Sequence, residues 1–335
     1  MASPTRFDVV GIGNAIVDVL ARTDDDFLVA QALAKGSMRL IDELEADRLY
    51  GMMGSSVEAS GGSAANTIAG IAGFGGKAAF LGRVRDDGLG RIFSHDIRAL
   101  GIHYPTSPAV AGAGTARCLI LVTPDGERTM NTYLGAAQEL TPDDMDEATI
   151  ASAGCTYLEG YLWDPPQAKE AFLRAARIAH ANGRQVALSL SDSFCVDRYR
   201  AEFLNLMREG IVDIVFANSH EVRALYETAD LETALGAVAR DVPHAIVTKS
   251  EDGVSVLKDG QRHDAPAWPV DDVLDLTGAG DLFAAGYLFG IARGGDIRKA
   301  ARLGAFAAAQ VIGQFGARPQ ASLAQLAEAE GLLPL

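Results

Sequence analysis

The chain has 335 residues, of which 48% are hydrophobic and 22% charged, and it carries a formal net charge of −15. This balance is that of an ordinary globular protein, long enough for one large α/β domain with an insertion or for two domains. The excess of acidic residues excludes nucleic acid as a general partner, because neutralising its phosphates requires clustered Lys and Arg.

Cysteine usage and hydropathy exclude further classes of protein. Cys118, Cys155 and Cys195 lie far apart and form no Cys-x-x-Cys pair, so neither a zinc framework nor a disulfide scaffold is expected. The N-terminal residues lack an apolar core of signal-peptide length, and no apolar run is long enough to cross a bilayer. We therefore expect a cytoplasmic protein without a membrane partner.

The chain opens with a short β-rich run, 7–12, which predicts a buried first strand that leads into a loop at Asn14. Asp18 then lies within the apolar segment 15–20, where a buried carboxylate requires a partner. A hydroxyl-rich ligand would supply one, and an internal Arg or an exposed strand face would explain the residue equally well.

A glycine pair, Gly61-Gly62, opens a small-residue segment that is predicted to be helical and to end at the glycines of 73–76. Asn66 lies one turn into this helix, where its side chain can both donate and accept hydrogen bonds. Contact with a ligand and tight packing with an Asn cap are the two interpretations of this segment.

Two strands, 116–122 and 129–133, are predicted to pair as a hairpin, because the residues between them include the Pro and Gly of a tight turn. The hairpin stands apart from the alternating elements that follow. We expect the segments 15–47 and 104–133 to form a small β lid, from which Arg128 would reach either a phosphate or solvent.

After residue 141, strands alternate regularly with helices, which predicts a mainly parallel sheet covered on both faces. We expect one three-layer α/β/α domain over residues 1–335. Ligands of such sheets bind beyond the carboxyl ends of the strands. Polar residues follow the predicted strands at Asn14, Glu159, Asp192, Asn218, Lys249 and Asp281. This shared placement favours a single site.

The stretch 275–281 has two glycines around an alanine, then Asp281, and an apolar helical pattern begins at once. Glycines and the unpaired amides of a helix N-terminus together form an anion hole. A carboxylate would repel a phosphate there unless it accepts a proton from an attacking hydroxyl. A simple Gly-rich turn with a helix cap is the alternative.

Three patterns in this order resemble the signatures of the ribokinase-like carbohydrate and nucleoside kinases, the PfkB family. They are Gly61-Gly62-x-x-x-Asn66, Asn218-x-x-Glu221 and Asp275-x-Thr277-Gly278-Ala279-Gly280-Asp281. The resemblance covers nearly the whole chain. It departs from the family pattern at Leu276, where the family usually has Thr.

Within this family, the chain is most similar to the adenosine kinases. The similar stretches are Gly13-Asn14 with Asp18, 188–194 followed by 212–218, and 303–308. Ser63 in the early glycine motif is also found in adenosine kinases. Those kinases tend to have His where this chain has Ala305, so the adenine contact there is expected to differ.

The resemblance implies transfer of the γ-phosphate of ATP to the primary 5′-hydroxyl of adenosine. Asp281 would act as general base, and the anion hole would be formed by the amides of Gly278, Ala279, Gly280 and Asp281. The implied substrate-binding residues are Asn14, Asp18, Gly62, Ser63, Asn66, Met38, Phe194 and Glu159, with Leu40 beside Met38 in the lid.

The resemblance also places the nucleotide and its ions. The implied ATP-binding residues are Asn218, Thr248, Lys249, Gly253 and Ala305. Glu221 would act on Mg²⁺ through water, since Mg²⁺ keeps much of its hydration. Asp275 and Thr277 resemble the start of a site for a monovalent cation such as K⁺.

Other functions remain open at this point. A sugar kinase of the same family, acting on ribose, fructose or a keto-deoxy sugar acid, is the main alternative, and a non-catalytic nucleoside-binding protein is a second. A dehydrogenase is excluded, because Gly11-Ile12-Gly13 lacks a third glycine at the required spacing. The partner is expected to be a small-molecule nucleoside or sugar, and the protein either a monomer or a homodimer.

Overall fold

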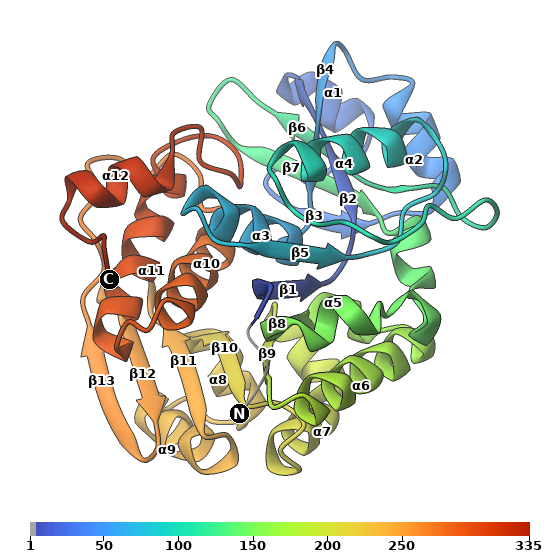
Figure 1. Ribbon diagram of the computed structural model, residues 1–335. Helices are drawn as coiled ribbons and strands as arrows, with labels where there is room; N and C mark the ends of the chain where they lie inside the picture. Colours follow the sequence, from blue (N-terminus) through green and yellow to red (C-terminus); the bar gives the residue numbers. More distant parts are fainter. Residues whose placement is uncertain (1–4) are drawn as a thin grey trace.

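Figure 1 shows the computed structural model of the chain, which describes residues 5–335. Residues 1–4, the start of the stretch in which no signal peptide was expected, lie outside the described part. Within residues 5–335, no helix is long and apolar enough to span a bilayer.

Strands and helices occupy most of the described chain. The strands are Phe7–Ile12 (β1), Ile16–Arg22 (β2), Met38–Leu40 (β3), Ser56–Gly61 (β4), Ala78–Leu81 (β5), Ala116–Val122 (β6), Arg128–Tyr133 (β7), Ala153–Glu159 (β8), Gln185–Ser189 (β9), Ile214–Asn218 (β10), His244–Thr248 (β11), Val254–Lys258 (β12) and Gln261–Ala265 (β13). The α-helices are Asp25–Ala30 (α1), Glu43–Tyr50 (α2), Ser63–Gly73 (α3), Gly88–Ala99 (α4), Glu147–Ala151 (α5), Pro166–Ala181 (α6), Ser193–Arg208 (α7), Ser219–Leu225 (α8), Leu231–Asp241 (α9), Ala279–Ala292 (α10), Ile297–Ile312 (α11) and Leu323–Ala329 (α12).

The larger sheet has the strand order β13-β12-β11-β10-β9-β8-β1-β5. Its strands from β5 to β11 are parallel, β12 pairs antiparallel with β11, and β13 pairs antiparallel with β12. Helices α3, α10, α11 and α12 cover one face and α5 to α9 the other, each over its own apolar core (Figure 1). The predicted three-layer α/β/α arrangement is confirmed. Helices on both sides are needed because the strands are apolar on both faces of the sheet.

Helix α10 is apolar on every side, and its position is set by glycines that allow neighbouring helices to approach closely. A Cβ atom on Gly286 would lie 2.5 Å from the carbonyl oxygen of Leu303, and one on Gly290 would lie 2.8 Å from the Cα of Ala300. Both neighbours belong to α11, so the two helices are in backbone contact. This packing fixes the N-terminus of α10, which carries Asp281.

The smaller sheet has the strand order β3-β7-β6-β2-β4 and lies beside the larger one in Figure 1. It includes β4, which lies outside the two segments expected to form a lid. The chain passes between the sheets at two short connections, one from β1 to β2 at Asn14 and one from β4 to α3 at Gly62. Gly62 has φ +96°, and a Cβ there would lie 2.2 Å from the carbonyl oxygen of Asn14, so the two connections touch and require glycine.

Candidate active site

A cavity of about 940 Å³ is lined by the smaller sheet and by residues at the carboxyl ends of the parallel strands. It brings together segments that are far apart in the sequence. Its lining includes these residues predicted for the site: Asn14, Asp18, Met38, Gly62, Ser63, Asn66, Glu159, Phe194, Asn218, Glu221, Thr248, Thr277, Gly278, Ala279, Gly280 and Asp281.

The carboxylate of Asp281 is held at both oxygens. Oδ1 accepts a 2.6 Å hydrogen bond from Ser63 Oγ, and Oδ2 accepts one of 3.2 Å from Asn66 Nδ2. Burial raises its pKa to about 6, although these two donors act to lower it. At neutral pH it is therefore mainly ionised and able to take a proton. Ser63 and Asn66, which were expected to hold substrate hydroxyls, position this carboxylate.

An anion hole was predicted at the backbone before Asp281. Gly278 caps α10 with φ +79°, and a Cβ there would lie 2.8 Å from Ala317. The amide of Ala279 donates to the carbonyl of Leu276 at 3.2 Å, so it is engaged within the turn. The amides of Gly280 and Asp281 donate to no group within residues 5–335. These two amides and the helix dipole are left to attract an anion.

Glu159 joins the end of β8 to the connections between the sheets. Its Oε1 accepts from Asn14 Nδ2 at 2.6 Å, and its Oε2 accepts from the backbone amide of Ala64 at 2.8 Å. Burial raises its pKa to about 7. Asn14 Oδ1 is buried and has no hydrogen-bond partner in the described part of the chain. Glu159 thus orients Asn14 and leaves an acceptor for a ligand.

Asp18 lies on β2 and lines the cavity. Burial raises its pKa to about 6, while the positive charges of Arg318 and Arg128 oppose this shift. Neither arginine forms a direct hydrogen bond or ion pair with Asp18 in the described chain. A Cβ on Gly61 would lie 2.4 Å from Asp18 Oδ2, so the neighbouring strand leaves room for this carboxylate only because it has glycine there.

The smaller sheet gives the cavity an apolar wall. Ile120 and Met130 line it from β6 and β7, and Met38 and Leu40 line it from β3. Met38 and Leu40 are 49% and 55% exposed, and Phe194 at the start of α7 is 77% exposed. Large apolar side chains with this exposure are suited to covering a flat apolar ligand.

A second, narrower cavity of about 130 Å³ shares lining residues with the first, among them Thr248, Ala279 and Gly280. Its remaining wall includes Gly253, Trp268, Ala305, Ala308, Ala309 and Ile312. The small side chains of α11 leave a slot with apolar sides, which suits an aromatic base. Gly280 therefore lies where the two cavities meet.

Comparison with known proteins agrees with this arrangement. The sequence pattern of pfkB family carbohydrate kinases matches residues 40–323. The chain belongs to the PfkB family. Along 87% of its length it is 30% identical to the ATP-dependent ribose-1-phosphate kinase of Halopiger xanaduensis, of which it covers 94%.

Two solved structures resemble this PfkB-family chain closely. It is 55% identical to an adenosine kinase from Sinorhizobium meliloti, with a TM-score of 0.90 over 97% of this chain and 99% of that one. It is 54% identical to a probable sugar kinase from Rhizobium etli, with a TM-score of 0.92 over 98% and 100%. The protein is thus a phosphotransferase with an alcohol acceptor, and kinases of this family use ATP, typically with Mg²⁺.

Asn218 and Glu221, which were expected to act on ATP and on Mg²⁺ respectively, form a capping box at the start of α8. Asn218 Nδ2 donates to Glu221 Oε1 at 2.5 Å, and Asn218 Oδ1 accepts from the amides of His220 and Glu221. Burial raises the pKa of Glu221 to about 7. Residues 5–335 contain no cluster of three metal-ligating side chains. The Glu221 carboxylate has oxygen atoms of the kind that Mg²⁺ binds, directly or through water.

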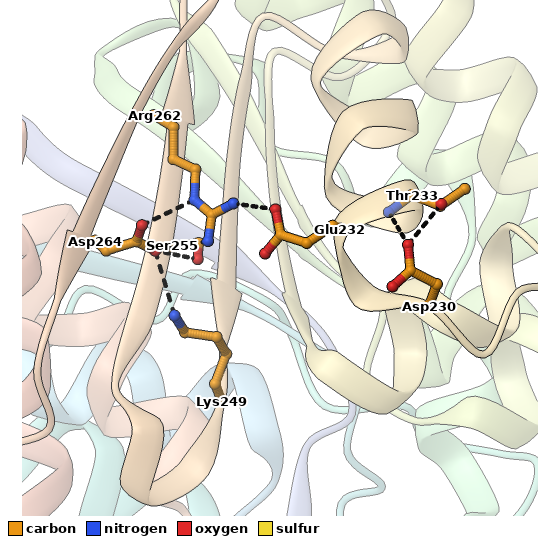
Figure 2. Close-up of polar contacts among 7 residues, drawn as sticks. All are labelled: Asp230, Glu232, Thr233, Lys249, Ser255, Arg262 and Asp264. Atoms are coloured by element: carbon orange, nitrogen blue, oxygen red, sulfur yellow. Dashed lines mark hydrogen bonds and ion pairs between the residues drawn. The ribbon is translucent and has the colours of Figure 1, made fainter.

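Lys249 does not line either cavity, although it was expected to contact ATP. Figure 2 shows its ammonium group turned toward Asp264, to which it donates at 3.2 Å. Arg262 and Ser255 donate to the same carboxylate. Lys249 therefore belongs to a surface charge network on β12 and β13. Thr248 and Gly253, its neighbours in the prediction, do line the slot.

The predicted monovalent-cation residue Asp275 is already paired with a cation. Its Oδ2 lies 2.9 Å from Arg128 Nη2, and both side chains are buried. The amides of Thr277 and Gly316 donate to the two carboxylate oxygens at 3.0 and 2.9 Å. Arg128 thus links β7 to the loop 275–281, and its buried guanidinium group is paired with Asp275 and not free in solvent.

Arg318 was not identified from the sequence, although it contacts site residues directly. Its Nε donates to Asn66 Oδ1 at 3.0 Å, and its Nη1 donates to Ser60 Oγ at 2.6 Å. The only sequence signal was a cation in the loop after the last long helix, 252 positions beyond Asn66. No local pattern predicts a contact over that separation.

Proposed function

We propose that this PfkB-family protein is an ATP-dependent adenosine kinase, which transfers the γ-phosphate to the 5′-hydroxyl of adenosine. The observation that carries the proposal is the mixed lining of the larger cavity. Asn14 supplies a buried acceptor and Asp18 a partly buried carboxylate, while β3, β6 and β7 supply an apolar wall. A nucleoside has the matching halves, a hydroxyl-bearing ribose and an apolar, aromatic base.

The ribose half is assigned to Asp18 and Asn14. A carboxylate accepts hydrogen bonds from two neighbouring hydroxyls, and the free Oδ1 of Asn14 accepts another. A deoxy analogue leaves a buried acceptor unpaired, which is a strong basis for selectivity. The base half is assigned to the apolar wall, with Met38, Leu40 and Phe194 closing over the purine.

The reaction takes place where the two cavities meet. Asp281 takes the proton of the 5′-hydroxyl, the 5′-oxygen bonds to the γ-phosphorus, and the bond from that phosphorus to the ADP oxygen breaks. The free amides of Gly280 and Asp281 stabilise the transferring phosphoryl group. Mg²⁺, when bound near Glu221, neutralises phosphate charge. We include no monovalent cation, because Arg128 already neutralises Asp275.

A sugar kinase of the same family is the second candidate. The similarity to a ribose-1-phosphate kinase and to a probable sugar kinase favours it. An apolar wall suits an aromatic base, whereas a free sugar does not require one. We therefore rank adenosine before a sugar as the proposed substrate.

The test is ADP production with Mg-ATP against adenosine, inosine, 2′-deoxyadenosine, ribose, ribose 1-phosphate and fructose. Selective turnover of adenosine, with a large loss on 2′-deoxyadenosine, supports the proposal. Turnover of a sugar alone overturns the substrate assignment and leaves the phosphotransfer chemistry in place. Adenosine-induced thermal stabilisation without ADP production would indicate a non-catalytic nucleoside-binding protein.

A further inference from the structure

We propose that Arg318 is a positioning residue for phosphoryl transfer, which fixes the Asn66 amide so that its N–H group faces the general base Asp281. This inference rests on the proposed kinase chemistry. It is carried by a chain of side-chain contacts that starts in the loop after α11 and ends at the reacting carboxylate.

The chain of contacts determines the orientation of the Asn66 amide. Arg318 Nε donates to Asn66 Oδ1 at 3.0 Å, and Asn66 Nδ2 donates to Asp281 Oδ2 at 3.2 Å. A guanidinium group only donates and a carboxylate only accepts, whereas an amide has one end of each kind. Turning the amide over would place donor against donor and acceptor against acceptor. Arg318 therefore ensures that Asn66 supports the carboxylate form of Asp281.

Arg318 also brings a buried positive charge between carboxylates from several elements. Burial lowers its pKa to about 10, so it remains a cation at neutral pH. The acids whose charges stabilise this cation are Asp18 on β2, Asp96 on α4 and Asp281 on α10. Arg128 on β7 is the other cation that acts on Asp18, and Glu159 on β8 interacts unfavourably with Asp281.

The fork of the guanidinium group suits this role better than a single ammonium. Arg318 Nη1 donates to Ser60 Oγ at 2.6 Å, and the Ser60 amide donates to Asp96 at 3.0 Å. Two donors in one plane thus connect β4 and α3 at once. A lysine at this position keeps the charge and loses the fork. A methionine keeps most of the volume but loses both the charge and the fork. Comparing the two variants therefore separates the effect of the charge from the effect of the fork geometry.

The experiment measures kcat, KM and their pH dependence for wild type, Arg318→Lys and Arg318→Met, using the substrate that wild type phosphorylates. Both variants are expected to lose at least about tenfold in kcat. The acid limb of kcat/KM is expected to move upward by about one pH unit or more in Arg318→Met, and to stay near the wild-type position in Arg318→Lys. Arg83→Met is the matched control, because Arg83 binds Glu139 and Asp144 away from Asp281.

Carboxyl NMR provides a second measurement that needs no turnover. The Asp281 signal is assigned by its loss in Asp281→Asn, and its pKa is followed in wild type and in Arg318→Lys and Arg318→Met. Wild type without turnover would overturn the proposed function alone. An unchanged Asp281 pKa in Arg318→Met, or a kcat within twofold of wild type in both variants, would overturn the role of Arg318.

Discussion

At Asp281, burial and hydrogen bonding act on one carboxylate in opposite directions. Burial favours the neutral acid, whereas Ser63 and Asn66 donate to the charged form. The balance places the pKa at about 6, which is higher than an exposed Asp and still below neutral pH. A general base needs this combination, because it must be ionised before the reaction and gain proton affinity from its surroundings.

Asp281→Asn is therefore expected to lower kcat by about 10²- to 10⁴-fold, because the amide cannot take the 5′-hydroxyl proton. Adenosine binding is expected to change little, since Asn keeps an acceptor for Ser63. Steady-state kinetics and calorimetric titration with adenosine measure the two effects. Asp230→Asn, at the remote N-cap of α9, is the matched control and should keep wild-type turnover. A kcat within tenfold of wild type in Asp281→Asn would remove Asp281 as base.

For Asp18 we predict a different role, in the choice between ribose and deoxyribose. In Asp18→Asn, the negative charge and one of the two acceptor oxygens are lost, so the hydrogen bonds that a carboxylate accepts from two neighbouring hydroxyls are weakened. The ratio of kcat/KM for adenosine over 2′-deoxyadenosine is expected to fall by about 10- to 100-fold. Competition between the two nucleosides in one reaction measures this ratio. An unchanged ratio would place the hydroxyl-binding group elsewhere.

At the scale of whole elements, the sequence was a good guide where apolar periodicity determines the structure. The parallel strands, the helices on both faces and the glycine-flanked start of α10 follow from local patterns. Contacts between distant side chains could not be predicted in the same way. Three such contacts depend on which loops the fold brings together. They are those of Lys249 with Asp264, Arg128 with Asp275 and Arg318 with Asn66. Residue type alone indicated only that these charges needed partners.

The contact between α10 and α11 gives a prediction about an element. In Gly286→Ala, the new methyl group would meet the Leu303 carbonyl oxygen at 2.5 Å, and backbone cannot move aside cheaply. We expect a loss of about 1–3 kcal/mol in the free energy of unfolding. Gly236→Ala is the matched control, because Gly236 is an exposed glycine inside α9 with only Arg240 Nη1 within 4 Å, at 3.8 Å.

The control is expected to change the free energy of unfolding in the opposite direction. Alanine is favoured over glycine in a helix interior, so Gly236→Ala should gain about 0.5–1 kcal/mol. Urea unfolding of both variants against wild type measures the difference. Equal effects of the two substitutions would show that helix propensity, and not the close contact with α11, determines the cost at Gly286.

At the scale of the whole molecule, the acidic chain buries several acids around one cavity. Asp18 and Asp281 have pKa values raised to about 6, and Glu159 and Glu221 to about 7, in each case mainly by burial. A raised folded-state pKa means that the folded protein binds protons more readily than the unfolded chain. These groups therefore reduce stability as pH rises through that range. His244 has the opposite effect, because burial lowers its pKa from 6.5 to about 4. It therefore reduces the stability of the folded protein as pH falls below 6.5.

Glu221→Gln isolates one of these contributions, because glutamine keeps the side-chain acceptor of the capping box and removes the ionisable group. In wild type, Glu221 contributes a penalty that grows from its ordinary pKa of 4.5 to its folded value of about 7 and is constant above it. The stability of the variant relative to wild type should therefore increase between pH 5 and pH 8, by on the order of 1–3 kcal/mol. The contribution of His244 is the same in both proteins and cancels. Urea unfolding at the two pH values measures this difference, with the exposed Glu209→Gln as control. A difference that is constant with pH would mean that Glu221 is as easily ionised in the folded protein as in the unfolded chain, and that burial at the start of α8 does not hold its proton.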